Sequence, residues 1–219
     1  MLLALVLTFG IAGGIPLPDA RQMPQTLWAF ALGIGGELMF GLAMGMILSL
    51  VFIAVQWAGE MIGQQMGLNI SEVLDPQFGA AGSLIGDMYF MMTLVVFLTV
   101  RGHEAMLMGL RASFDKLPLM SVGLDRPLFD LLTGLFTSAT TLAIQLAAPM
   151  LVTMLVVDLA LGCISKTIPQ LNVMTAGMSV RGIIGILVLI AGLTMSSRVM
   201  RGAVLDAMER VQLQYSTAR

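Results

Sequence analysis

Few residues in this chain have the chemistry of a catalytic site. An activated nucleophile needs a serine or Cys163 beside a base, and the single histidine, His103, lies in the charged run 101–104. A solvated side chain is the ordinary interpretation of a histidine there. One cysteine and one histidine cannot form a zinc site. Residues 33–36 (GIGG) lack the preceding strand and following lysine of a phosphate loop. The sequence therefore predicts a protein that is not an enzyme and holds no metal or cofactor.

Four acidic residues lie in apolar stretches: Glu37, Glu60, Asp87 and Asp158. Ionisable groups within a membrane mark ion or substrate pathways, or else they pair internally. A relay needs neighbouring titratable groups, and these acids are scattered, so internal pairing is favoured, with Arg181 and Lys166 as candidate partners. A small secondary transporter that couples through Glu60, Asp87 and Asp158 is the alternative.

The composition is that of a membrane protein. The chain has 219 residues, of which 58% are hydrophobic and 11% charged, with a mean hydropathy of +0.93, whereas soluble domains carry about 25% charged residues. Its net charge of -2 and the lack of a basic block argue against nucleic acid as a partner. The 20 methionines fit ordinary filling between helices or an adaptable surface that repacks.

Residues 56–76 (QWAGEMIGQQMGLNISEVLDP) are the one stretch where polar residues interrupt the apolar chain in a pattern. A polar stripe and a glycine stripe each recur at every fourth position, on neighbouring faces of a helix: Gln56, Glu60 and Gln64, and Gly59, Gly63 and Gly67. The glycines predict that another helix approaches closely. The polar stripe predicts hydrogen-bonding partners or a water-lined cavity.

The helical period ends after Gly67, and residues 68–76 predict a loop. Its residues Leu68, Ile70, Val73 and Leu74 are apolar, although exposed loops are normally polar. We therefore take this apolar loop as the first candidate for a functional element.

The long apolar stretches do not fit single membrane spans. A helical pattern begins near Thr26 and continues to Gln65, and such a helix of about 40 residues is too long for one span, so a bend or two stacked segments are expected. Pro149 predicts a kink within residues 131–157.

The remaining helical segments are short. Residues 104–114 predict an amphipathic helix, residues 182–197 an apolar segment that is short for a span, and residues 198–219 a separate amphipathic tail. At the other end, residues 1–15 are expected to be the end of a hydrophobic helix, with a signal peptide as the alternative.

A sharp reversal between helices is predicted after Asp158. Ser165 and Lys166 end one helix, Pro169 fixes a turn, and Gln170 and Asn172 satisfy backbone groups that the turn frees. Such a turn between apolar flanks is tolerated only if protein buries it, which indicates subunit contacts.

Together these segments resemble the FliR family of flagellar biosynthesis proteins and its counterparts in type III secretion injectisomes. The resemblance rests on residues 58–68 (AGEMIGQQMGL), 75–76 (DP), 148–149 (AP), 158–162 (DLALG) and 168–172 (IPQLN). It covers essentially the whole chain. Family members usually begin with a further hydrophobic helix, which this sequence is expected to lack.

The resemblance implies an all-α fold of bent and kinked hydrophobic helical hairpins, assembled in a helical hetero-oligomer. Residues 1–126 would be a FliP-like half and residues 127–219 a FliQ-like half with an amphipathic C-terminal tail. It implies a structural and gating subunit of the flagellar type III export gate, a channel for unfolded export substrates. The implied partners are FliP-like and FliQ-like subunits and FlhB-like and FlhA-like proteins. The implied location is the bacterial inner membrane and flagellar basal body, largely above the lipid plane.

The resemblance also implies a plug loop at residues 66–79 that closes the channel, with Gly67 and Gly79 as hinges. The plug residues are Gly67, Leu68, Asn69, Ile70, Ser71, Glu72, Val73, Leu74, Asp75, Pro76, Gln77 and Phe78. Residues expected to support the plug or pack subunits are Gln56, Gly59, Glu60, Gly63, Gln64, Gln65, Asp158, Pro169, Gln170 and Asn172. A passive assembly scaffold without a gating role stays open as a further alternative.

Overall fold

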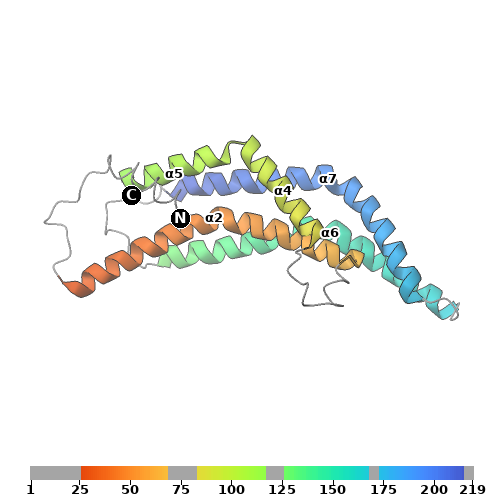
Figure 1. Ribbon diagram of the computed structural model, residues 1–219. Coiled ribbons are helices and arrows are strands. Elements are labelled where there is room, and N and C mark those ends of the chain that lie inside the picture. Colours follow the sequence, from red (N-terminus) through yellow and green to blue (C-terminus); the bar gives the residue numbers. More distant parts are fainter. Residues whose placement is uncertain (1–25, 69–82, 117–125, 168–172, 215–219) are drawn as a thin grey trace. The chain divides into compact units, whose positions relative to one another are not determined.

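The computed structural model describes residues 26–68, 83–116, 126–167 and 173–214, and it contains only helices in these ranges (Figure 1). The helices are α2 (Leu27–Met66), α4 (Leu84–Thr99), α5 (Gly102–Lys116), α6 (Arg126–Thr167) and α7 (Val173–Gln214). The prediction of an all-α fold is confirmed.

Helix α2 is continuous over 40 residues. It begins directly after Thr26, whose carbonyl oxygen accepts a hydrogen bond from the Phe30 N–H at 3.0 Å. Of the two alternatives predicted, a bend or two stacked segments, the second is wrong, because the run contains glycines but no proline, and glycine weakens a helix without breaking it. At 1.5 Å per residue, such a helix is about twice as long as the hydrocarbon core of a bilayer is thick.

Helix α7 is likewise one helix of 42 residues. The sequence predicted an apolar segment at 182–197 and a separate amphipathic tail from 198, and this division is wrong. Arg198 and Arg201 are both exposed, so their charges end the apolar stretch without interrupting the backbone hydrogen bonds. A change in hydropathy marks a change of surroundings, whereas a helix ends only where its backbone pattern ends.

The chain forms two compact units. The first consists of Met1–Leu48, Arg101–Leu135 and Asp206–Arg219, and the second of Ser49–Val100 and Phe136–Leu205. Each unit therefore takes segments from both sides of residue 126. The division at 126 was drawn from a family resemblance and not from contacts, so it stays a prediction.

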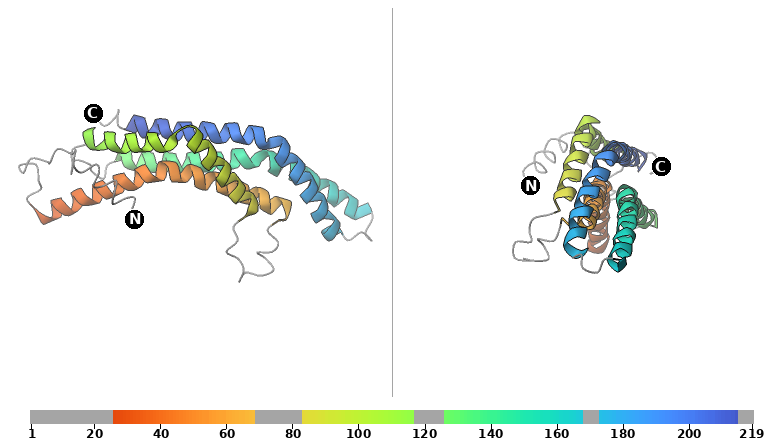
Figure 2. Two further views of the ribbon diagram at one scale, coloured as in Figure 1. Left: turned by 45° about the horizontal axis from the view of Figure 1, so that its top comes forward. Right: turned by 90° about the vertical axis from the view of Figure 1, so that its right-hand side faces the viewer.

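In the second unit, the core side of α2 repeats every fourth residue. Leu50, Ala54, Ala58, Ile62 and Met66 are each at most 6% exposed. This spacing keeps one stripe of the helix buried along five turns. Helix α4 runs beside this part of α2 (Figure 2). The small residues Ala54 and Ala58 leave room for a close neighbour.

Aromatic side chains join the same two helices. The ring of Phe52 in α2 lies 5.4 Å from the ring of Phe90 and 5.8 Å from that of Phe97, both in α4, measured between ring centroids. The second pair is arranged edge to face, the geometry that aromatic quadrupoles favour. These contacts help to fix how α2 and α4 pack.

Much of the apolar surface is uncovered. Helices α2, α6 and α7 are each long and apolar enough to cross a membrane, and α4 with α5 qualify as a fourth span only if taken together. Only 6% of the most apolar stretch of α7 is buried, against 28% in α2 and 22% in α6. Lipid or other protein must therefore cover these faces in the cell.

In the first unit, α5 matches the short helix predicted at 104–114. Its Gly109 and Ser113 are buried, while His103 and Arg111 are exposed. The imidazole of His103 lies 4.0 Å from the Glu104 carboxylate with half of its side chain in solvent. The prediction of a solvated His103 is confirmed.

Candidate functional site

Helices α2 and α4 meet backbone to backbone at Gly59 and Gly86, both of which are buried. A methyl group on Gly59 would lie 2.6 Å from the Gly86 Cα atom and 2.7 Å from the Ile85 carbonyl oxygen. Carbon atoms in van der Waals contact stand about 3.5 to 4.0 Å apart, so there is no room for any side chain. The predicted close approach at Gly59 is confirmed, and its partner is α4 of the same chain.

The predicted polar stripe borders this contact. Gln56, Glu60 and Gln65 are half-buried, and Gln64 is exposed. The Gln56 carbonyl oxygen and the Glu60 Cγ atom both lie 3.3 Å from where a methyl group on Gly86 would be. The stem of Glu60 therefore covers the glycine contact. Its predicted role in supporting a plug stays a prediction.

Helix α2 ends as the sequence predicts, at Gly67. The backbone of Gly67 is left-handed, with φ of 74°. The Gly67 N–H donates to the Gln64 carbonyl at 3.0 Å, and the Leu68 N–H donates to the Gly63 carbonyl at 3.1 Å. This pair of bonds is the Schellman arrangement, which satisfies carbonyls that a helix end leaves open and favours glycine at the left-handed position. The chain therefore leaves α2 in a defined direction.

The last residue of α2 contacts α7. Met66 is 2% exposed, and a methyl group on Gly185 would lie 2.5 Å from its Cγ atom and 3.0 Å from its sulfur. Gly185 thus provides the space that the methionine side chain fills. Gly63, one turn earlier, is also buried.

The first described residues after this end of α2, from Ser83 onward, are also held by contacts. Ser83 is 5% exposed and caps α4, because its Oγ atom accepts a hydrogen bond from the Gly86 N–H at 3.3 Å. Asp87 lies in the first turn of α4 and is exposed. A carboxylate there interacts favourably with the helix dipole.

The charged pair Asp158 and Arg181 joins α6 to α7. The Asp158 Oδ1 and Arg181 Nη2 atoms are 2.7 Å apart, and each side chain is 40% exposed. Arg181 was one of the two bases proposed as partners for the apolar acids. Its Nε atom is buried and has no hydrogen-bond acceptor among the residues described. The predicted role of Asp158 in packing subunits stays a prediction.

Helices α6 and α7 run antiparallel within the second unit. The Leu161 side chain of α6 lies 3.4 Å from where a methyl group on Gly177 of α7 would be. Asp158, which precedes Leu161 in α6, forms an ion pair with Arg181, which follows Gly177 in α7. The chain therefore reverses between Thr167 and Val173, as predicted. The turn residues Pro169, Gln170 and Asn172 themselves lie outside the described residues.

Most of the predicted plug also lies outside the described residues, namely Asn69, Ile70, Ser71, Glu72, Val73, Leu74, Asp75, Pro76, Gln77 and Phe78. Of the predicted segment 66–79, the structure describes only Met66, Gly67 and Leu68.

The acids named in the transporter alternative do not converge within the described ranges. Asp158 is paired with arginine, Asp87 is exposed at a helix start, and Glu60 lies along Gly86. The same ranges hold no group of three or more residues of the His, Cys, Asp and Glu types that could bind a metal. The arrangement does not favour a proton or ion relay, which needs neighbouring titratable groups.

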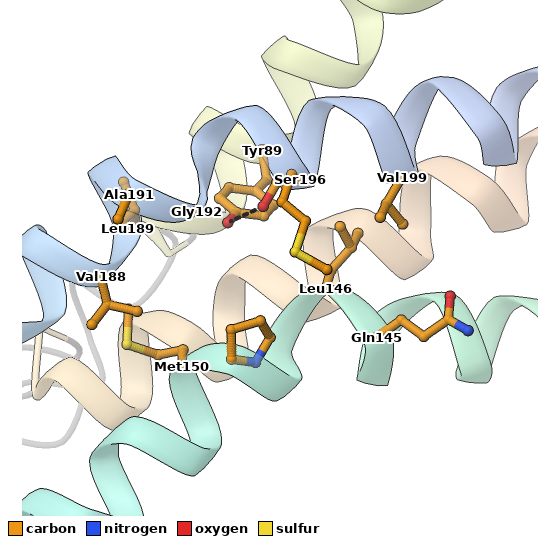
Figure 3. A pocket seen from close by; sticks show the side chains of 12 residues that line it. Tyr89, Gln145, Leu146, Met150, Val188, Leu189, Ala191, Gly192, Ser196 and Val199 are labelled. Carbon is orange, nitrogen blue, oxygen red and sulfur yellow. Dashed lines mark hydrogen bonds between the residues drawn. The ribbon is translucent and has the colours of Figure 1, made fainter.

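A groove lies between α6 and α7, with α4 behind it (Figure 3). Its volume is about 270 Å³. We call it the α6/α7 groove and define it by its lining residues: Tyr89, Gln145, Leu146, Pro149, Met150, Val188, Leu189, Ala191, Gly192, Met195, Ser196 and Val199. Helix α6 changes direction between Gln145 and Met150 (Figure 3). Pro149 has no N–H to donate to the Gln145 carbonyl, so a kink is expected there.

Sequence reasoning missed three residues of this region: Gly86, Gly185 and Tyr89. A signal for Gly86 exists in the sequence, since a second glycine near the start of the next apolar stretch is what a close contact at Gly59 requires. Gly185 and Tyr89 carry no comparable local signal.

The long apolar helices, with their largely uncovered faces, define a class: an integral membrane protein built from packed helices. The sequence pattern of the bacterial export proteins, family 1, matches residues 1–207. The chain belongs to this family. The predicted resemblance is thereby confirmed.

Individual relatives have corresponding names. The flagellar biosynthetic protein FliR of Bacillus subtilis (strain 168) is 36% identical over 160 residues, which cover 70% of this chain and 61% of that protein. FliR of Escherichia coli (strain K12) is 30% identical over 184 residues, 84% of this chain and 69% of that protein. The surface presentation of antigens protein SpaR of Shigella flexneri is 28% identical over 153 residues, 70% and 59% respectively. Two of these names are those of flagellar biosynthetic proteins and one is that of a protein for the surface presentation of antigens, and none is that of an enzyme, as the sequence predicted.

Proposed function

We propose that the chain is a structural and gating subunit of the flagellar type III export gate, helping to form the channel for unfolded export substrates. The family match over residues 1–207 carries this proposal. Uncovered apolar faces support it, because a subunit of a larger assembly exposes surfaces that its neighbours cover. The names of the FliR relatives favour the flagellar system over an injectisome.

Residues 67–78 are the proposed plug. The contacts at both ends of the connector support this role. On one side Met66 is seated on Gly185 and Gly67 fixes the exit from α2. On the other side Ser83 caps α4, whose Gly86 rests on Gly59. A loop that blocks a channel must be held at its ends so that it returns to the same place after each passage.

The backbone geometry at Gly67 bears on its proposed role as a hinge of the plug. A left-handed glycine that makes both Schellman bonds is a defined end of a helix. Opening the plug would therefore require motion beyond Leu68, and Gly67 acts as the anchor. Gly79, the other proposed hinge, lies in the part of the chain that the structure does not describe.

The proposed partners are FliP-like and FliQ-like subunits, with FlhB-like and FlhA-like proteins at the same assembly. Residues 1–126 would be the FliP-like half and residues 127–219 the FliQ-like half. The turn residues Pro169, Gln170 and Asn172, with Asp158, would pack against neighbouring subunits. The assembly would sit in the bacterial inner membrane and basal body, largely above the lipid plane.

The partner proposal is tested by co-purification. A tagged full chain should retain FliP-like and FliQ-like proteins, and the mass of the intact complex gives the number of each subunit. Recovery of the chain alone from cells that express all three would overturn the partner assignment and leave the family membership intact.

The plug proposal is tested by deleting residues 69–77. We expect the deletion to raise the leak of small ions in cells that carry the assembled gate, because the stopper is removed while both helix ends remain. Co-purification of the deletion variant with its partners verifies assembly. Normal assembly with an unchanged leak would remove the gating role and leave a passive scaffold.

A further inference from the structure

The end of α2 is seated on a glycine of α7. A methyl group on Gly185 would lie 2.5, 2.9 and 3.0 Å from the Cγ, Cε and Sδ atoms of Met66, which are the three nearest atoms around it. All three belong to one side chain, so the methionine lies along the bare backbone of Gly185. We call this contact the Met66 seat. Because carbon atoms in contact stand about 3.5 to 4.0 Å apart, any larger residue at position 185 must displace Met66.

Met66 has little freedom to yield. Its side chain is buried, so other atoms enclose it on the sides that Gly185 does not. Its Cγ atom is one bond from Cβ, and this atom moves away only by a change of χ1 or by a movement of the helix. A helix leaves a long side chain about two of the three χ1 rotamers. A displaced Met66 therefore shifts its neighbours or the end of α2 itself.

The Met66 seat lies directly beside the exit of the chain from α2. The next residue, Gly67, is left-handed, with φ of 74°. The N–H groups of Gly67 and Leu68 make the two bonds that end the helix, at 3.0 and 3.1 Å. Both bonds need the last turn of α2 in its place. The direction in which the chain leaves the helix therefore depends on where Met66 is held.

Helix α7 is tied to α6 at the same level. Arg181 lies one turn before Gly185 and so on the same face of α7, and its Nη2 atom is 2.7 Å from the Asp158 Oδ1 atom of α6. Only 6% of the most apolar stretch of α7 is buried within the chain. A helix with so little internal cover depends strongly on the few contacts that it makes. The position of α7 at Gly185 therefore sets the position of Met66.

We propose that Gly185 is a positioning residue for the plug. Through Met66 it fixes the direction in which the proposed plug, residues 67–78, leaves α2, so that a shift of α7 moves the base of the plug. The inference rests on the proposed function, because it assigns control of that same plug to α7. It gives a role to a glycine that lies far from the loop in the sequence and outside the two predicted hinges.

Hydrogen exchange tests the Met66 seat independently of the channel. The full chain is purified with the subunits that it retains, and exchange of the Gly67 and Leu68 amides is followed by mass spectrometry with fragmentation. Gly185→Ala should speed this exchange by about tenfold, which corresponds to about 1.4 kcal/mol and lies within the usual cost of overpacking. Gly182→Ala is the control, because a methyl group there meets nothing within 4 Å. Equal exchange in the two variants would overturn the proposal.

A second substitution separates the Met66 seat from a general effect on α7. Met66→Ala removes all three atoms that the new methyl group would overlap. The double variant, Gly185→Ala with Met66→Ala, should therefore exchange more slowly than either single variant, because the alanine methyl fills part of the space that the methionine leaves. A double variant no slower than Gly185→Ala would show that the new methyl group acts elsewhere, which would overturn the proposal.

Met66→Ala also keeps the test decisive if Gly185→Ala fails to assemble. It leaves a cavity instead of an overlap, and the loss of a buried methionine should speed exchange of the Leu68 amide by about tenfold or more. Helix α5, which belongs to the other compact unit, provides the reference amides, whose exchange should stay unchanged. Unchanged exchange at Leu68 in Met66→Ala would overturn the proposal.

The leak of small ions tests the link to the plug. In cells that carry the assembled gate, Gly185→Ala should raise the leak less than deletion of residues 69–77 does, and it should add nothing to the leak of the deletion variant. A leak raised by the deletion and not by Gly185→Ala would overturn the positioning role and leave the plug in place. An unchanged leak in the deletion variant would remove the plug, and the positioning role with it.

Discussion

The contact between α2 and α4 and the contact between α6 and α7 solve the same packing problem in opposite ways. At Gly59 and Gly86 two backbones touch and no side chain fits between them. Between α6 and α7 an ion pair joins the helices at Asp158 and Arg181, while beside Pro149 a groove of about 270 Å³ lies between them.

The difference concerns how much each contact can adjust. A contact between backbones has one geometry, because no rotamer can absorb a displacement. An ion pair that includes an arginine keeps its bond while the helices shift, since the long arginine side chain has many rotamers. The rigid contact lies beside the end of α2, where the proposed plug begins. The adjustable contact lies in the hairpin that is proposed to pack against other subunits.

The largest expected effect comes from Gly59→Ala. Its methyl group would overlap the Gly86 Cα atom, and overpacking of this kind costs about 1 to 3 kcal/mol. We expect a lower thermal unfolding midpoint in detergent. Gly41→Ala in the same helix is the control, because a methyl group there meets nothing within 4 Å. Equal midpoints for the two variants would show that the α2–α4 contact is not rigid.

A smaller effect is expected at the ion pair. Because both side chains are 40% exposed, Asp158→Asn or Arg181→Gln should each lower the unfolding free energy by about 1 kcal/mol or less outside a membrane. The exchanged double variant, Asp158→Arg with Arg181→Asp, should recover most of the loss. Failure of the exchange to recover stability, measured by the same thermal unfolding, would mean that the contact is not adjustable.

The sequence predicts which residues of α2 make close contacts better than it predicts the residues of other helices that they meet. Gly59, Gly63 and Gly67 recur at every fourth position, which places them on one helix face. Such a local spacing can be read directly from the sequence. The choice of Gly86 and Gly185 as partners depends on how three helices align with one another. The spacing within a single helix does not contain that information.

The ion pair was easier to anticipate than the groove. Arg181 follows Asp158 across a proline turn, so an antiparallel hairpin brings them to the same level. The groove requires a kink in α6, a missing side chain at Gly192 and a tyrosine from α4, which are three separate segments. Charges at Arg198 and Arg201 misled the prediction about α7, because hydropathy reports the surroundings of a helix and not its length.

The smallest expected effect comes from removing the hydrogen bond between Tyr89 and Ser196 in the wall of the groove. Tyr89→Phe removes the hydroxyl that bonds to Ser196 at 3.3 Å but keeps the ring in place. A serine hydroxyl in a helix can turn to a carbonyl of the preceding turn, so the loss should be only about 0.5 to 1 kcal/mol. Ser196→Ala and the double variant complete a cycle that isolates the coupling between the two residues. A coupling of zero in thermal unfolding would show that the bond between the two hydroxyl groups does not hold α4 against α7, and that packing alone positions Tyr89 in the wall of the groove.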